Sequence, residues 1–305
     1  MSTESFGAAS RLRITDSDRP GETNAVVLLV LLAVGLAAMF APTYLELARV
    51  VWSTDEQGHG PLILAASAWM AFQRRHLLAA LPVVRPTTSA WALLAVGLLV
   101  YWVGQSQSIL LFAAGSQILV LAGLLMLFKG GAGVRVMRFP LLFLLFMVPL
   151  PGTLVAALTA PLKAAVSTVA ASILYQLGYP VGRSGVVLQV GQYQMLVADA
   201  CSGLNSIFSL EALGLLYMNL KNYTSALRNT VLAILLVPIS FCANVVRVLV
   251  LVLVTYHFGD AAGRGFVHEF AGILLFLVAI VLMLFTDRIL DLFFHRGAVQ
   301  TPAQP

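Results

Sequence analysis

Long apolar runs, separated by short polar segments, recur along most of the 305-residue chain. A helix that crosses a bilayer needs about 20 mostly apolar residues, with about 17 as the practical minimum. By this rule the runs predict eight transmembrane helices. They lie near residues 25–43, 60–73, 90–103, 109–128, 139–157, 204–220, 230–254 and 269–286.

A further apolar stretch at 158–178 contains Pro161 and Lys163 and is rich in Ala, Ser and Thr. This composition favours an interfacial or re-entrant helix over a ninth span. The ninth span stays open as the alternative, and it would invert the orientation of everything that follows.

Residues 180–200 alternate apolar and polar side chains, with glycines at the expected turns. The pattern predicts a short hairpin, with strands at Val186–Val190 and Tyr193–Val197 joined at Gly191-Gln192. Because unpaired extended backbone does not face lipid, the hairpin is expected outside the bilayer or in a protein cavity.

The two ends of the chain differ from the apolar runs. Residues 1–24 carry Arg11, Arg13 and Arg19 mixed with acids, and no small-residue cleavage site follows. We therefore expect a disordered cytoplasmic tail at 1–24, one transmembrane domain at 25–290 and a second cytoplasmic tail at 291–305.

Composition agrees with an all-α polytopic membrane protein. Apolar residues make up 60% of the chain and charged residues 10%, against about a quarter charged in an ordinary soluble domain. The apolar content excludes intrinsic disorder, and two cysteines exclude a disulfide scaffold. The net charge of +5 does not indicate nucleic-acid binding, because the basic residues are scattered.

Orientation follows from Lys and Arg in the short loops, which concentrate on the cytoplasmic side. With the N-terminus inside, four basic residues lie outside, and Arg247 lies within a span. The outer four are Arg49, Lys163, Arg183 and Arg264. The inner thirteen are Arg11, Arg13, Arg19, Arg74, Arg75, Arg85, Lys129, Arg135, Arg138, Lys221, Arg228, Arg288 and Arg296. Both termini are therefore predicted inside.

Cys201 lies where the predicted outer hairpin becomes a helix, between Asp199 and the Ser202-Gly203 pair. The positive end of a helix dipole favours a thiolate, so Cys201 is a candidate nucleophile. The alternative is an apolar buried cysteine, which is the interpretation we give to Cys242 in the middle of a span.

Arg247 stands inside an apolar run, with Asn244 three residues earlier on the same helix face. An arginine deep in a span costs about 2.5–3.5 kcal/mol on insertion scales, so it usually faces a partner or a wet cavity. The alternative is an arginine that snorkels to the outer headgroups.

His268 opens the last predicted span, at the same outer level as Cys201. The predicted topology thus brings a thiol, a cation and an imidazole to one face. These are the groups of cysteine-based acyl transfer, in which a base takes the thiol proton and a cation holds the oxyanion or substrate. His59, in the first outer loop, is a supporting candidate. No cofactor is indicated, and metal binding has little support because ligand spacings are missing.

The chain resembles the exosortase and archaeosortase family, over about residues 55–290. The resemblance is carried by Ala200-Cys201-Ser202-Gly203-Leu204, Asn244-Val245-Val246-Arg247-Val248, and His268 before a span with Gly272. His59-Gly60, Phe139-Pro140 and Pro149-Leu150-Pro151 agree as well. The continuation Leu204-Asn205-Ser206 departs from the arginine found in other members, which suggests a subtype such as the B type.

The resemblance implies a membrane-embedded cysteine peptidase or transpeptidase in a bacterial plasma (inner) membrane, with its active site facing the periplasm. It implies Cys201 as nucleophile, Arg247 as cation and His268 as general acid/base, with Asn244, Ser202 and His59 in support. The implied partners are exported proteins with a C-terminal tail made of a Pro-Glu-Pro-like motif, a transmembrane helix and a basic cluster. The family is linked to exopolysaccharide production.

Two alternatives to an enzyme remain open at this point. One is a lipid- or glycan-handling membrane protein of a polysaccharide export system, in which Arg247 binds an anionic lipid or sugar phosphate. The other is a structural subunit of such a system, for which Cys201 is dispensable.

Overall fold

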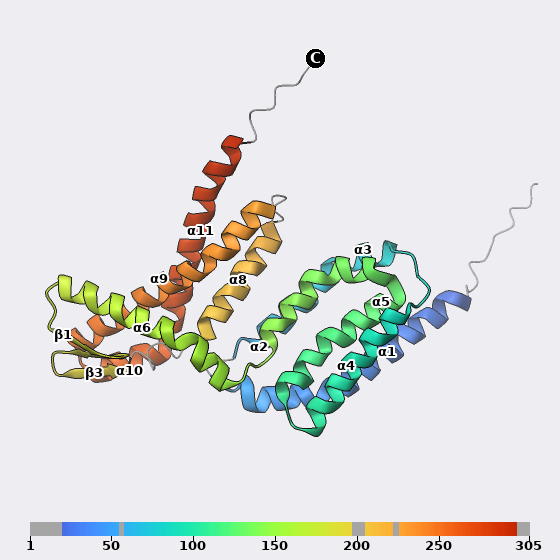
Figure 1. The fold of residues 1–305 in the computed structure, drawn as a ribbon, viewed down its shortest axis with the longest axis horizontal. Coiled ribbons are helices and arrows are strands. Elements are labelled where there is room, and N and C mark those ends of the chain that lie inside the picture. The colour runs from blue at the N-terminus through green and yellow to red at the C-terminus, as the bar shows by residue number, and fades with distance from the viewer. Residues whose placement is uncertain (1–19, 55–57, 197–204, 222–225, 298–305) are drawn as a thin grey trace, which may run out of the picture. The chain divides into compact units, whose positions relative to one another are not determined.

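The computed structural model describes residues 20–54, 58–196, 205–221 and 226–297 (Figure 1). In these ranges the regular elements are helices, together with one small three-stranded sheet at residues 181–196. The elements, in chain order, are α1 (Pro20–Glu46), η1 (Leu47–Val51), α2 (Gly60–Gln73), α3 (Arg75–Ala80), α4 (Thr88–Ser106), α5 (Leu110–Phe143), η2 (Leu144–Met147), α6 (Gly152–Gln176), β1 (Val181–Ser184), β2 (Val187–Val190), β3 (Tyr193–Leu196), α8 (Asn205–Lys221), α9 (Ala226–Phe258), α10 (Asp260–Glu269) and α11 (Ala271–Gly297).

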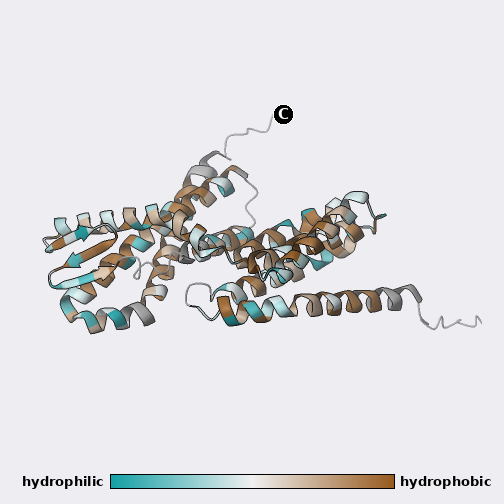
Figure 2. Ribbon diagram, turned by 60° about the horizontal axis from the view of Figure 1, so that its bottom comes forward, coloured by the Kyte–Doolittle hydropathy of each residue, from teal (hydrophilic) through white to brown (hydrophobic). Residues whose placement is uncertain are grey.

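Within the described ranges, six helices are long and apolar enough to cross a membrane. They are α1, α4, α5, α6, α9 and α11. The 14-residue α2 is apolar but shorter, and α8 has 17 residues. The predicted polytopic helical class is therefore confirmed, whereas the count of eight spans is not. Figure 2 shows the long helices mostly in the brown of hydrophobic residues, while the strands mix brown with teal.

The chain divides into two compact units, residues 1–45 and 46–305. The first contains nearly all of α1, which begins at Pro20 and so starts within the predicted tail; residues 1–19 lie outside the described residues. At the other end α11 continues to Gly297, past the predicted tail boundary at 291. The rest of this description concerns the second unit.

Helices α4 and α5 pack along a seam of glycines. A Cβ atom at Gly97 of α4 would lie 2.9 Å from the Val120 backbone nitrogen, and one at Gly123 of α5 would lie 2.9 Å from Leu94 Cα. Such close backbone approach is the usual way in which membrane helices associate, since lipid gives them little hydrophobic drive. Thr87 caps the start of α4 by accepting a hydrogen bond from the Ala90 backbone nitrogen.

Gly130 divides α5 into two limbs. Its φ of 65° and ψ of −165° are non-helical, and the ribbon changes direction there (Figure 1). The first limb matches the predicted span at 109–128. The predicted span at 139–157 is wrong as one helix, because the second limb ends at Phe143, η2 ends at Met147 and Pro149 and Pro151 interrupt the helix before α6.

Helix α6 is longer than the interfacial segment predicted at 158–178. It has 25 residues, begins after Pro151 and ends before Gly178, whose φ is 86°. Its length and composition are sufficient for a span.

The sheet is a three-stranded antiparallel meander in the order β1-β2-β3. Val190 pairs with Tyr193, which leaves a two-residue connection at Gly191-Gln192, with Gly191 at a φ of 59°. Strands β2 and β3 therefore lie in the two segments for which the sequence predicted strands, and β3 ends at Leu196. The first strand, β1, was not predicted. Leu188 and Val190 of β2 are fully buried in a cluster with Val166 of α6 and Val248 of α9.

Helices α9 and α11 form an antiparallel pair joined by a turn at Gly259, the short α10 and a break at Phe270. Their shared cluster includes Leu236 and Ala243 of α9, Leu275 and Ala279 of α11, and Leu210 of α8. At the far end Arg228 forms ion pairs with Asp287 at 2.7 Å and with Asp291 at 2.5 Å. These contacts fix the register of the helices that carry the site.

Candidate active site

Arg247 belongs to a buried polar face of α9. Ser240, Asn244, Arg247, Leu251 and Thr255 recur every three or four residues, and all are buried, Arg247 at 5% exposure. The face runs between two apolar clusters, one that includes Val245, Val248 and Val252 and one that includes Leu236, Ile239 and Ala243. The structure therefore does not support a snorkelling arginine.

Asn244 lies one turn before Arg247 and is 1% exposed. Its Nδ2 donates to the Ser240 carbonyl at 3.0 Å, while Oδ1 has no hydrogen-bond partner in the described part of the chain. A buried amide oxygen without a partner costs free energy. Asn244 Oδ1 is thus a buried acceptor one helical turn from Arg247.

The register of α10 brings His268 to the level of Arg247. A Cβ atom at Gly263 would overlap Thr255, so these two residues are opposite each other on α10 and α9. Arg247 is eight residues before Thr255 in α9, and His268 is five residues after Gly263 in α10. The backbone of His268 therefore lies about 4.5 Å along the helix axis from that level; its side chain is outside the described residues.

The start of α8 reaches the same level. A Cβ atom at Gly214 would overlap Leu236, which places these residues opposite each other in the antiparallel pair of α8 and α9. Nine residues back from Gly214 is Asn205, the first residue of α8, and nine residues on from Leu236 is Val245. Asn205 therefore lies beside the part of α9 that carries Asn244 and Arg247.

Cys201 and Ser202 lie outside the described residues, between β3 and α8. Cys201 precedes Asn205 by four residues in the sequence. The described elements on both sides are anchored, since Met195 of β3 packs against the cluster formed by α6, β2 and α9, and α8 packs on α9 and α11.

His59 lies directly before α2, half-buried, with no side-chain cap bond. Burial lowers the pKa of its imidazole, which favours the neutral form. No hydrogen bond or ion pair joins it to Asn244 or Arg247 among the described residues. Its supporting role stays a prediction.

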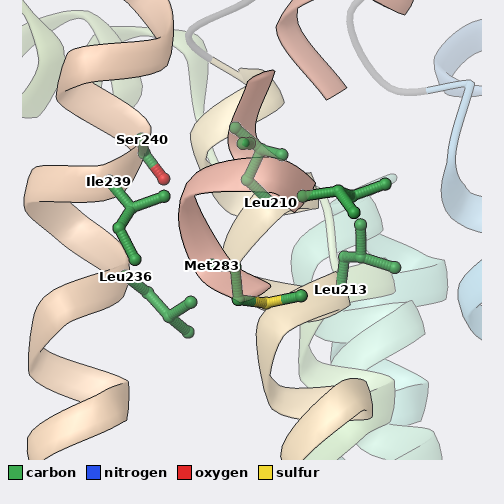
Figure 3. A pocket seen from close by; sticks show the side chains of 8 residues that line it. Leu210, Leu213, Leu236, Ile239, Ser240 and Met283 are labelled. Carbon is green, nitrogen blue, oxygen red and sulfur yellow. The ribbon is translucent and has the colours of Figure 1, made fainter. Parts of the chain in front are cut away.

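A small cavity of about 10 Å³ lies one turn from Asn244, between α8, α9 and α11. It is lined by apolar side chains such as Leu210, Ile239 and Met283, and by Ser240, whose oxygen points towards them (Figure 3). Its volume is near the minimum for one water molecule, and its lining is nearly all apolar. The cavity therefore has little room for a polar ligand beside Ser240.

A family model for transmembrane exosortases matches residues 51–285 of the chain. The chain belongs to the transmembrane exosortase family. The match covers 235 of 305 residues and includes Cys201, Arg247 and His268. Searches of curated proteins and of solved structures each gave no match. Exosortase membership and the long apolar helices identify the chain as a multi-pass membrane protein.

Two features of α9 were missed from sequence. Ser240 and Thr255 extend the buried polar face of α9, and their spacing from Asn244 and Arg247 is a helical signal that could have found them. At the end of α9, Tyr179 approaches His257 at 3.1 Å from hydroxyl to Nε2, and Tyr256 packs edge-on against both rings. That cluster joins segments 78 residues apart, so no local pattern reveals it.

Proposed function

We propose that this exosortase is a membrane-embedded cysteine peptidase or transpeptidase. It cleaves the C-terminal Pro-Glu-Pro-type sorting tail of exported proteins at the extracytoplasmic face of a bacterial inner membrane. Cys201 is the nucleophile, Arg247 the cation and His268 the general acid/base. Asn244, Ser202 and His59 support them.

One observation carries the proposal: a buried Arg247 beside an acceptor on Asn244, at the level where α8 begins and α10 ends. Burial removes the guanidinium from water, which strengthens its interaction with an anion. The two neighbouring helix ends belong to the segments that carry Cys201 and His268. Family membership supports a sorting peptidase as the coarse function.

In the proposed reaction, His268 removes the proton from the Cys201 thiol, and the thiolate attacks the carbonyl carbon of the scissile peptide bond. The oxyanion forms within reach of the Arg247 guanidinium. The carbon–nitrogen bond then breaks, and His268 returns the proton to the leaving amine. Water or an amine attacks the thioester and frees the thiol, which gives hydrolysis or transpeptidation.

The decisive experiment compares the two cysteines. Cys201→Ala and Cys201→Ser are expected to abolish processing of a tailed substrate, because a serine hydroxyl is far less ionised than a thiol near neutral pH. Cys242→Ala is the matched control and should process normally. The readout is the ratio of cleaved to uncleaved substrate, with membrane abundance of each variant measured in parallel. Full processing by Cys201→Ser would contradict the covalent mechanism.

A further inference from the structure

A polar hollow lies where α2, the second limb of α5 and α8 meet, apart from the face of α9 described above. Its volume is about 710 Å³, within the range of about 300–1,000 Å³ typical of ligand pockets. Its polar lining consists of Gln73, Arg74, Arg135, Arg138 and Asn219. None of its ten lining residues is acidic.

Arg74 is a fixed wall of this hollow. Its Nη1 donates to the Val136 carbonyl at 2.9 Å, and its Nη2 donates to Asn219 Oδ1 at 2.8 Å. Asn219 Nδ2 in turn contacts the Met70 sulfur at 3.3 Å. Three helices therefore hold one guanidinium in place through neutral acceptors, which leave its charge unneutralised.

Arg135 and Arg138 add two more charges. Both side chains are exposed, and no hydrogen bond or ion pair holds either of them among the described residues. Burial, with Arg138 as a second cause, lowers the pKa of Arg74, although an arginine keeps its charge at neutral pH. Three cations around one hollow repel each other, and a bound anion would offset that repulsion.

Apolar side chains also line the hollow. Trp69, Leu77 and Leu220 are 45%, 62% and 51% exposed. Helices α2 and α8 end here, at Gln73 and Lys221, so the hollow lies at one end of both apolar helices. Exposed tryptophan beside arginine at a helix end is typical of the lipid headgroup region.

We propose that this hollow binds a phosphate-bearing anion, the headgroup of an anionic phospholipid. Arg74, Arg135 and Arg138 hold the phosphate, Gln73 and Asn219 surround the polar headgroup, and Trp69, Leu77 and Leu220 contact the start of the acyl chains. Basic pockets between membrane helices are known to hold such headgroups. The charge distribution assigns this end of the helices to the cytoplasmic leaflet. The proposal does not rest on the catalytic assignment.

The test uses the full-length protein in a mild non-ionic detergent. Dihexanoyl phosphatidylglycerol, dihexanoyl phosphatidylcholine and inorganic phosphate are titrated separately, and binding is followed by tryptophan fluorescence. The variant Arg135→Gln/Arg138→Gln spares the bonds of Arg74. Its matched control is Arg85→Gln/Arg288→Gln, which removes the same charge from two other exposed arginines. Circular dichroism checks that each variant is folded.

We expect phosphatidylglycerol to bind the wild type and the control alike, and the Arg135/Arg138 variant about tenfold more weakly. Phosphatidylcholine should bind much more weakly than phosphatidylglycerol to the wild type. Equal binding by the variant and the wild type overturns the site. Equal binding of the two lipids overturns recognition of an anion. Inorganic phosphate that binds as tightly as phosphatidylglycerol overturns the lipid as the source of the phosphate.

Discussion

Arg247 is the residue whose environment says most about the site. Its side chain is 5% exposed, in the middle of a helix that has apolar clusters on both sides of its polar face. Placing an arginine there is costly. A site that needs a planar cation would justify the cost, because a guanidinium binds an oxyanion or a carboxylate through two parallel hydrogen bonds.

Arg247→Lys should therefore be nearly as damaging as Arg247→Ala. Lysine keeps the charge but presents it as a point, without the planar fork. We expect both variants to process substrate about 10²-fold more slowly, as when one oxyanion donor is lost. The measurement is the initial rate of substrate cleavage beside the membrane abundance of each variant. A lysine variant close to the wild-type rate would leave only a charge requirement.

The two cysteines should differ in their reactivity. Cys242 is exposed on α9, two residues after the buried Ser240 and two before the buried Asn244, so it lies on the side opposite the buried polar face. The prediction of a buried Cys242 is therefore wrong: it rested on the apolar sequence neighbours of Cys242 and not on its position opposite the polar face of α9. Lipid rather than protein should cover this thiol.

A membrane-impermeant maleimide applied to intact vesicles of defined orientation should label Cys201 and spare Cys242. Each thiol is tested separately, because the chain has two cysteines. The variant Cys201→Ala retains Cys242, and the variant Cys242→Ala retains Cys201. In detergent without lipid, Cys242 should become reactive. Labelling of Cys242 by the impermeant reagent in intact vesicles would contradict its position on the lipid side.

At the scale of elements, apolar run length predicted the existence of most helices but not all of their ends. The sequence places α4 and α9 well, because each run has polar residues at both sides. It fails at 139–157, where the apolar run at 141–148 leads directly into Pro149 and conceals a helix end. A window that counts apolar residues does not detect the missing backbone donors of Pro149 and Pro151.

The seam of α4 and α5 gives a test of element packing. Gly123→Ala should lower the free energy of unfolding by about 1–3 kcal/mol, because its Cβ would lie 2.9 Å from Leu94 Cα and the two backbones would have to separate. The matched control is Gly131→Ala, in the same helix, where an added Cβ meets nothing within 4 Å.

The control should be neutral or more stable by up to about 1 kcal/mol, since alanine favours a helix over glycine. The readout is the midpoint of thermal unfolding in detergent for both variants and the wild type. Equal midpoints for the two alanine variants would show that the glycine seam tolerates a methyl group.

At the scale of the whole molecule, contacts between distant segments show which helices lie side by side and in what register, which the length of apolar runs does not. The sequence suggested Cys201, Arg247 and His268 through residue type and position, yet only the pairing of Gly214 with Leu236 and of Gly263 with Thr255 gives the register of α8, α9 and α10. Likewise the hydrogen bond between Arg74 and Asn219 joins residues 145 positions apart.

That hydrogen bond bears on the open question of α6. Arg74 follows α2 and Asn219 lies near the end of α8, so the two helices end on the same side of the membrane. Between them the chain passes through α4, two limbs of α5, α6 and α8. If α6 does not cross, the other four segments return the chain to the same side of the membrane. If α6 crosses as well, the five crossings leave Arg74 and Asn219 on opposite sides. The contact therefore favours an α6 that does not cross.

We expect single-cysteine labelling at residues 150 and 178, which flank α6, to report the same side, together with residues 191 and 262 outside. Residue 221 should report the inside, as the loop charges predict. Each site is tested in a background without native cysteines, by an impermeant reagent before and after permeabilisation. If 150 and 178 report opposite sides while 75 and 221 still agree, α6 crosses and one of the other segments between them, α4, α8 or one limb of α5, does not. The active-site face would then have to be assigned again from the labels at 191 and 262.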